Sequence, residues 1–154
     1  MVMTDLYPYL VTYRHFLETI WIETHQEWGN DIPSPPSHHM CRYTSLFLHE
    51  ILKKHHQYET IVISGRPAIK VNGSVNGVYG YRDVSGCWHD HTWLQMDKMI
   101  IDLTADQFHG DAIFMAENDG RYNPSTDQTI FKTDYDKLLK RVNNWIYQFE
   151  TNQF

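Results

Sequence analysis

Apolar side chains recur at helical spacing in the first third of the chain. From residue 5 to residue 28 they fall every three or four positions, which predicts a helix that begins near Tyr7 and ends at Gly29. The same spacing predicts a second helix over about 39–56, with Cys41 in its first turn. Three prolines in the segment between them disfavour both helix and strand, so we expect an extended loop there.

The end of the chain carries another helical pattern. Residues 133–149 place large apolar side chains on one stripe, and Thr133 with Asp136 resembles a capping box at the start. Residues 109–132 show no sustained period and are predicted to be mostly loop, with a short strand near 112–115.

The middle of the chain predicts strands, because β-branched and aromatic residues alternate there with turn residues. A strand is expected over 60–64, and two weaker strands flank the turn-rich residues 72–77. Residues 86–96 and 99–103 form a predicted hairpin with a turn at 97–98. A short helix or turn is expected directly after the hairpin.

Helices at both ends and strands between them predict an α+β fold, with helices packed against an antiparallel β-sheet. The 154 residues fit a single domain, 1–154. With 42% apolar and 21% charged residues, the composition excludes a disordered chain, collagen and a coiled coil. Two cysteines are too few for a disulfide scaffold.

The predicted hairpin brings an imidazole beside a carboxylate. Strand alternation and a two-residue turn place Trp93 directly opposite Asp102, on the same face as His91. His91 is then a diagonal neighbour of Asp102, with about 7–8 Å between the two backbones. A carboxylate that accepts from one ring nitrogen fixes the tautomer and leaves the other nitrogen free to act as a base.

Cys41 supplies a candidate nucleophile. In the first turn of a helix, unpaired backbone N–H groups and the positive end of the helix dipole favour a thiolate, and the same N–H groups can hold an oxyanion. Cys41, His91 and Asp102 are therefore the predicted catalytic triad. Cys87 lies in a strand without this activation and is predicted to be structural.

These residues resemble, in order and spacing, the transglutaminase-like branch of the papain-like fold. The resemblance covers about residues 40–108 and rests on three segments: Cys41-Arg42-Tyr43-Thr44-Ser45-Leu46, His91-Thr92-Trp93 and Ile100-Ile101-Asp102-Leu103-Thr104. It implies acyl transfer through a thioester on the cysteine, which covers amide or ester hydrolysis, deamidation and transfer to an amine. It implies no cofactor and no metal.

Three more side chains are expected to line the cleft around the triad. Trp93 is predicted to pack over the His–Asp pair, and His39 precedes the nucleophile by two residues. His89 is predicted to share the strand face of His91 and Cys87, which makes it the chief competitor for the role of base.

The second donor of the oxyanion hole is not identified by the sequence. Many papain-like enzymes carry a glutamine about six residues before the cysteine, where this chain has Pro35. The donor is left open among several side chains: Gln26, Trp28, His38 and His39. Gln107 is a weaker candidate for a contact with substrate.

Two other functions compete with acyl transfer. His89 and His91, together with Cys87 or Cys41, have the residue types of a zinc site. The acidic, aromatic-rich chain also suits a non-catalytic binding domain, such as an immunity or inhibitor protein, whose partner would be another protein.

Charge narrows the classes of partner. The net charge is −6 and no Lys/Arg block exceeds two residues, which argues against nucleic acid and leaves a protein, peptide or small acyl substrate. The sequence shows neither an export signal nor an apolar stretch long enough to cross a membrane, so we expect a cytoplasmic protein, with secretion by a signal-less route left open. The oligomeric state is not predicted.

Overall fold

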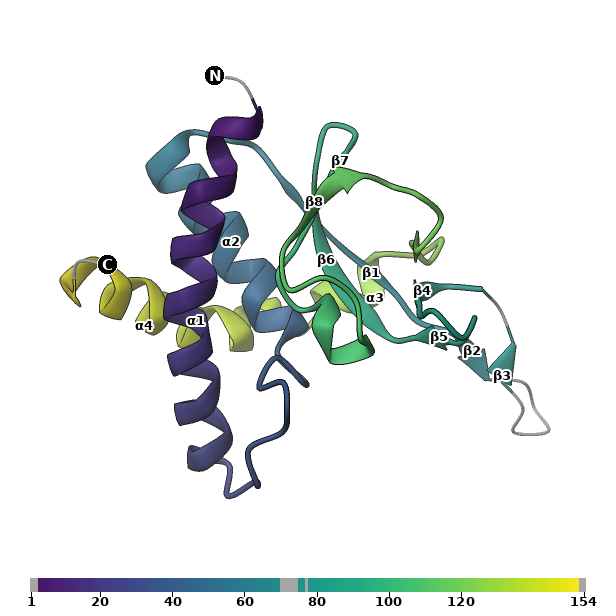
Figure 1. The fold of residues 1–154 in the computed structure, drawn as a ribbon, viewed down its shortest axis with the longest axis horizontal. Helices are drawn as coiled ribbons and strands as arrows, with labels where there is room; N and C mark the ends of the chain where they lie inside the picture. The colour runs from purple at the N-terminus through teal and green to yellow at the C-terminus, as the bar shows by residue number, and fades with distance from the viewer. Residues whose placement is uncertain (1–2, 70–74, 77, 153–154) are drawn as a thin grey trace.

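The structure is a computed structural model that describes residues 3–69, 75–76 and 78–152. Figure 1 shows the long helices gathered at one side of the molecule and the strands at the other. The α+β class predicted from the sequence is therefore confirmed, with helices and antiparallel sheets in one chain.

The three long helices match the three helical patterns in the sequence. They are α1 (Tyr7–Glu27), α2 (Cys41–His56) and α4 (Tyr135–Asn152). A 3-10 turn, η1 (Met3–Leu6), precedes α1, and the short helix α3 (Thr129–Lys132) precedes α4. α2 packs against both α4 and the sheet, so the helix that begins at the candidate nucleophile is central to the fold.

The start of α4 differs from the prediction of a capping box. The hydroxyl of Thr133 donates to the carbonyl oxygen of Ile130, 3.0 Å away and one turn back in the chain. The carbonyl oxygen of Asp134 instead accepts from the backbone N–H of Leu138 at 3.1 Å, and α4 begins at Tyr135. The threonine is used by the end of α3, a helix that the pattern of the sequence did not predict.

The main sheet has four antiparallel strands in the order β1-β6-β7-β8. Its strands are β1 (Ile61–Gly65), β6 (His91–Met96), β7 (Met99–Asp102) and β8 (Phe114–Glu117). Because β1 pairs with β6 rather than with its neighbour in sequence, the smaller strands of the middle region project from one end of this sheet (Figure 1).

The hairpin of β6 and β7 has the register predicted from the sequence. Met96 pairs with Met99, and the ladder continues to the pair Leu94 and Ile101. Asp97 takes a positive φ of 53° in the two-residue turn, a conformation that aspartate tolerates better than most residues. A 3-10 helix, η2 (Ala105–Phe108), follows β7 as expected.

The remaining strands form two smaller sheets. β4 (Gly80–Arg82) pairs with β5 (Trp88–His89) and with β9 (Tyr122–Asn123), while β2 (Ala68–Ile69) pairs with β3 (Val75–Asn76). Of the predicted weaker strands, the one near 78–81 overlaps β4, while residues 70–74 and 77, which include part of the one near 69–71 and most of the turn, lie outside the described residues. The two larger sheets approach each other at Gly65, where an added Cβ would overlap the backbone nitrogen of Gly80.

The main sheet separates two hydrophobic clusters. The larger one joins α1, α2 and α4 to one face of the sheet and includes Leu94 and Ile101. The smaller one lies on the other face and is largely aromatic: Tyr81, Trp93, Ile100, Ala105, Phe114 and Tyr122. Strand alternation puts Trp93 and Leu94 in different clusters, so His91 belongs to the aromatic side.

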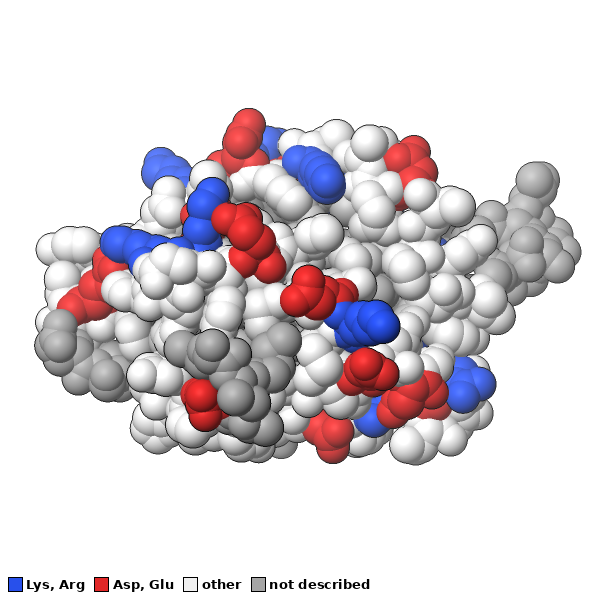
Figure 2. Space-filling view, turned by 90° about the horizontal axis from the view of Figure 1, so that it is seen from above, with Lys and Arg blue, Asp and Glu red and all other residues white. Residues whose placement is uncertain are grey.

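Acidic and basic side chains are interspersed on the face drawn in Figure 2, so neither charge dominates it. Within residues 3–69, 75–76 and 78–152, none of the helices combines the length and the apolar character needed to span a bilayer.

Candidate active site

Cys41 is the first residue of α2 and therefore lies in the first turn, as the sequence predicted. Met40, fully buried, is its N-cap, and the backbone N–H of Thr44 donates to the Met40 carbonyl oxygen at 2.9 Å. The indole of Trp21 on α1 donates to the Thr44 hydroxyl at 3.0 Å, which anchors this turn. The cysteine is therefore a partly exposed residue at the end of a fixed helix.

His91 and Asp102 form a buried pair at the adjoining ends of β6 and β7. Nε2 of His91 donates to Oδ2 of Asp102 at 2.6 Å. His91 is 0% exposed and Asp102 2% exposed, so water cannot compete for this hydrogen bond. The diagonal approach expected from the hairpin register is therefore present in the structure.

Asp102 is held by groups other than the imidazole. Its Oδ1 accepts from the backbone N–H of Thr104 at 2.9 Å and from the Thr104 hydroxyl at 3.2 Å. Its Oδ2 accepts a third side-chain hydrogen bond, from the hydroxyl of Tyr122 at 2.8 Å. Burial raises the pKa of Asp102, but the charge and hydrogen bond of His91, helped by these donors, hold it below its ordinary value.

The environment of His91 favours the charged imidazolium. Burial alone lowers its pKa, but the negative charge and hydrogen bond of Asp102 outweigh burial, and interaction with Cys41 adds to them. The pKa of His91 is raised to about 10. Its second nitrogen, Nδ1, is buried and has no hydrogen bond of ordinary geometry, which leaves that N–H for the cysteine.

Aromatic rings surround the imidazole. Trp93 lies 6.1 Å from His91 between ring centroids at an interplanar angle of 30°, and it is 1% exposed. Tyr81 and Phe108 meet His91 edge-on at 5.7 and 5.1 Å. Trp93 thus packs over the pair as predicted, and these rings keep water from the hydrogen bond to Asp102.

The structure corrects the placement of His89. β5 ends at His89 and β6 begins at His91, in a different sheet, so the two side chains do not share one strand face. Nε2 of His89 donates to Oδ2 of Asp83 at 2.7 Å, and its ring stacks on Phe108 at 4.5 Å. His89 is therefore engaged by its own carboxylate, although it shares Phe108 as a neighbour with His91.

Cys87 is also displaced from the predicted face. It precedes β5 in the loop that starts at Asp83, and its backbone N–H donates to Oδ1 of Asp83 at 3.0 Å. It is exposed, whereas Cys41 is partly buried at a helix end. The two free thiols therefore lie in different surroundings.

A cluster that the sequence did not predict joins three segments next to the site. Arg14 on α1 donates to both carboxylate oxygens of Asp106 at 3.2 and 2.7 Å, and to the carbonyl oxygen of Leu103 at 2.5 Å. Ser37 donates to Oδ1 of Asp106 at 2.5 Å. Ser37 is four residues before Cys41, so one carboxylate on η2 ties α1 to the loop that leads to the nucleophile.

The sequence held part of the signal for these contacts. Thr104 belongs to the quoted motif around Asp102, and its role is to hold that carboxylate. Tyr122 lies in a stretch predicted as loop, with no periodicity to mark it. Arg14 and Ser37 are separated from Asp106 by 92 and 69 residues, which no local pattern can connect.

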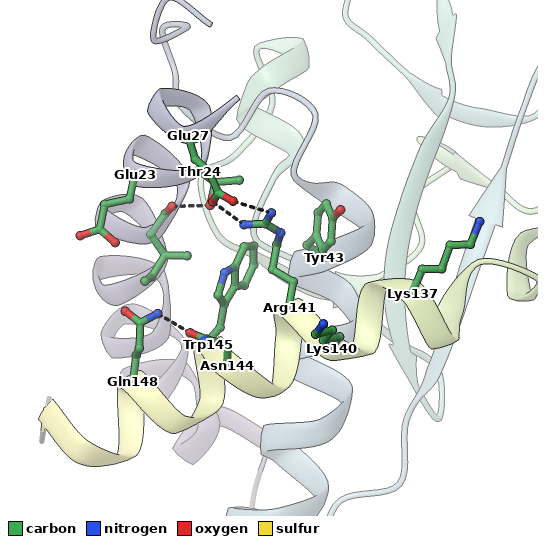
Figure 3. Close-up of a pocket in the computed structure, with 11 residues that line it drawn as sticks. Glu23, Thr24, Glu27, Tyr43, Lys137, Lys140, Arg141, Asn144, Trp145 and Gln148 are labelled. Atoms are coloured by element: carbon green, nitrogen blue, oxygen red, sulfur yellow. Dashed lines mark hydrogen bonds and ion pairs between the residues drawn. The ribbon is translucent and has the colours of Figure 1, made fainter. Parts of the chain in front are cut away.

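Several other features are separate from the triad. A groove of about 520 Å³ lies between α1 and α4, where Arg141 reaches across to Glu27 at 2.8 Å (Figure 3). Its lining includes Tyr43 but none of the three triad residues.

Over the described ranges, no three His, Cys, Asp or Glu side chains are grouped so that they could hold a metal ion, and the zinc hypothesis finds no ligand set there.

Comparisons with known proteins add little to this geometry. The sequence matches no protein-family model and no curated protein. One solved structure, described as that of a genomics target, is similar with a TM-score of 0.48 and 18% identity, over 87% of this chain and 75% of that chain. A likeness of this degree carries no argument about family or activity.

Proposed function

We propose that the chain is a cysteine-dependent acyl-transfer enzyme with a transglutaminase-like, papain-like fold. Cys41 is the nucleophile, His91 moves the proton and Asp102 orients His91. The observation that carries the proposal is that the two ring nitrogens of His91 have different partners. Nε2 is bound to the buried carboxylate of Asp102, and Nδ1 is left for the thiol at the start of α2.

The electrostatics of the His91–Asp102 pair support this assignment. The pKa of His91 is raised to about 10, so the imidazole carries a proton at neutral pH. A cation beside the sulfur, added to the positive end of the α2 dipole, favours the nucleophilic thiolate. Asp102 stabilises the imidazolium and remains ionised, since its own pKa is held low.

The reaction proceeds in two balanced stages. The Cys41 sulfur attacks the carbonyl carbon of an amide or ester, and the resulting oxyanion collapses as the C–N or C–O bond breaks. His91 gives its Nδ1 proton to the leaving amine or alcohol, which leaves a thioester on the cysteine. Water or an amine then attacks that thioester, His91 takes back a proton, and the C–S bond breaks to restore the thiolate.

An acyl donor of simple chemistry tests this proposal without knowledge of the natural substrate. The protein is mixed with p-nitrophenyl acetate at neutral pH, and intact mass and peptide mapping follow the acetyl group. We expect acetylation at Cys41 with release of p-nitrophenolate, the same result in Cys87→Ala, and none in Cys41→Ala.

The rival functions give different results in the same assay. Acetylation that is equal at both cysteines, or unchanged in His91→Ala, would contradict the proposal and favour a non-catalytic domain. Loss of the reaction on adding a chelator would favour a metal site, because a thiol enzyme does not respond to chelation.

A further inference from the structure

The proposed reaction puts a negative charge on the carbonyl oxygen each time the thiolate attacks. Backbone N–H groups in the first turn of α2 can supply one hydrogen bond to that oxygen. A second donor is needed for a complete oxyanion hole, and the position that many papain-like enzymes give to a glutamine holds Pro35 in this chain. The donor must therefore come from another residue.

Gln107 on η2 reaches the segment that leads to the nucleophile. Its Oε1 accepts from the backbone N–H of His39 at 3.4 Å, two residues before Cys41. The two terminal atoms of a carboxamide are fixed relative to each other, so Nε2 lies in the same region as the His39 N–H that contacts Oε1. Nε2 is buried and has no hydrogen-bond partner. Two N–H bonds at this place are thus left without an acceptor.

The backbone that carries Gln107 is firmly held. The preceding residue, Asp106, binds Arg14 on one side and Ser37 on the other, at 2.5–3.2 Å. η2 and the loop before Cys41 therefore keep a fixed spacing. A donor held in this way needs no reorganisation when charge develops, which is the condition under which such groups aid catalysis most.

The other buried donors without partners are less suitable. Nδ1 of His91 is assigned to the sulfur, and Nε1 of Trp93 belongs to a ring of the aromatic cluster that stacks on that imidazole. Nε of Arg42 belongs to a guanidinium that is drawn away toward α3 and α4, where it donates to Phe131 at 2.7 Å and Asp134 at 3.2 Å.

The remaining unpartnered atom, Nδ1 of His25, belongs to a ring whose Nε2 donates to the carbonyl oxygen of Pro36 at 3.1 Å. In a neutral imidazole with this tautomer, Nδ1 carries no proton and is not a donor. None of the four side chains named from the sequence (Gln26, Trp28, His38 and His39) has an orphaned buried donor among the described residues. The unused donor that lies beside the segment leading into Cys41 is therefore that of Gln107.

We propose that Gln107 is a catalytic residue that donates an N–H of Nε2 to the oxyanion, opposite the backbone N–H groups of α2. The inference rests on the proposed function. No proton is transferred in this step: the carboxamide stabilises the charge while the C–S bond forms, and the charge returns to the carbonyl as the leaving group departs. Oε1 keeps its contact with His39 throughout.

Two reactions of the same sulfur separate this role from a structural one. Acetylation by p-nitrophenyl acetate passes through an oxyanion, whereas alkylation by iodoacetamide does not. In Gln107→Ala and in the near-isosteric Gln107→Glu we expect acetylation of Cys41 to fall about 10²–10³-fold. Alkylation of Cys41 is expected to stay at the wild-type rate in Gln107→Ala, which also shows that the site has kept its structure. Gln26→Ala, at an exposed glutamine that the sequence left open, serves as the matched control.

The outcomes distinguish the two proposals. Wild-type protein that is alkylated but never acetylated at Cys41 overturns the acyl-transfer function, and the assignment of Gln107 with it. Wild-type acetylation that persists in both Gln107 variants overturns the role of Gln107 alone. Equal loss of acetylation and alkylation in Gln107→Ala also overturns it, because the residue would then only support the fold.

Discussion

Two histidines that stand two residues apart each bind an aspartate, yet their surroundings differ greatly. The His91–Asp102 pair has a separation of 2.6 Å and side chains that are 0% and 1% exposed. The His89–Asp83 pair has nearly the same separation, 2.7 Å, with side chains that are 36% and 17% exposed. Contact geometry is therefore almost equal, and burial is the main difference.

The comparison shows which histidine has the environment of a catalytic base. Coulomb interactions strengthen where water is excluded, so the buried carboxylate raises the pKa of His91 to about 10 against the opposing effect of burial. Asp83 also has a lowered pKa, but hydrogen bonding from Ser85 is the largest cause, ahead of His89. The His89–Asp83 pair is one part of a loop that Asp83 organises. The His91–Asp102 pair interacts with the thiol at the start of α2.

Removal of each imidazole gives the largest expected contrast. His91→Ala deprives the thiol of its proton partner, so we expect acetylation of Cys41 by p-nitrophenyl acetate to fall about 10²–10⁴-fold. His89→Ala leaves the His91–Asp102 pair in place and is expected to keep the wild-type rate. Burst kinetics of p-nitrophenolate release measure both. A larger loss in His89→Ala than in His91→Ala would reverse the assignment of the base.

The carboxylates are expected to differ in their effect on stability. Asp102→Ala leaves a buried imidazole without its partner, and breaking such a pair costs about 3–5 kcal/mol of unfolding free energy. Asp83→Ala removes a carboxylate whose histidine partner is partly exposed, and a smaller loss is expected because water can replace that partner. Urea unfolding monitored by circular dichroism compares the two variants with wild type. Equal losses would show that burial does not separate the pairs.

The pH dependence of stability sharpens the same contrast. The pKa of His91 in the folded protein is about 10, above the ordinary value of 6.5, so protonation of His91 stabilises the fold. This contribution is complete below about pH 6.5 and is lost as the pH rises toward 10. We expect the unfolding free energy to fall across this range in wild type and in His89→Ala.

In Asp102→Asn the neutral amide no longer favours the imidazolium, so the same pH range should show a flatter curve. Unfolding in urea at several pH values gives the slopes. A slope that is as steep in Asp102→Asn as in wild type would contradict the raised pKa of His91.

Tyr122→Phe gives the smallest expected change, because Asp102 keeps its bonds to His91 and Thr104. A hydrogen bond to a charged group is worth about 1.5–3 kcal/mol, and the loss in unfolding free energy should lie in that range. Tyr135→Phe, at a half-buried tyrosine outside this network, is a suitable control measured in the same way. An equal loss in the two variants would argue against a specific role for Tyr122.

The hairpin shows how much of the site can be predicted from local pattern. Alternation and a two-residue turn suffice to pair Met96 with Met99, and that register alone places His91 diagonal to Asp102. Helical spacing likewise places Cys41 in the first turn of its helix, although α2 begins at Cys41, two residues later than that spacing indicated. These features depend on residues close together in the chain, where few alternatives compete.

The errors and omissions arise where the chain leaves such regular elements. A break at Asp90 moves His89 into another sheet, which alternation across residues 86–96 cannot foresee. Tyr122 reaches Asp102 from β9, and Ser37 reaches Asp106 across 69 residues. Such contacts are set by tertiary packing, so a single sequence contains no local signal for them.

The central claim is that the buried His–Asp pair activates one cysteine of the two. The most direct measurement is the rate of carboxamidomethylation of Cys41 and Cys87 in the same molecules at neutral pH, followed by peptide mass. We predict that Cys41 reacts far faster than the exposed Cys87, and that His91→Ala removes this advantage. Equal rates at the two thiols, or faster reaction at Cys87, would contradict the account.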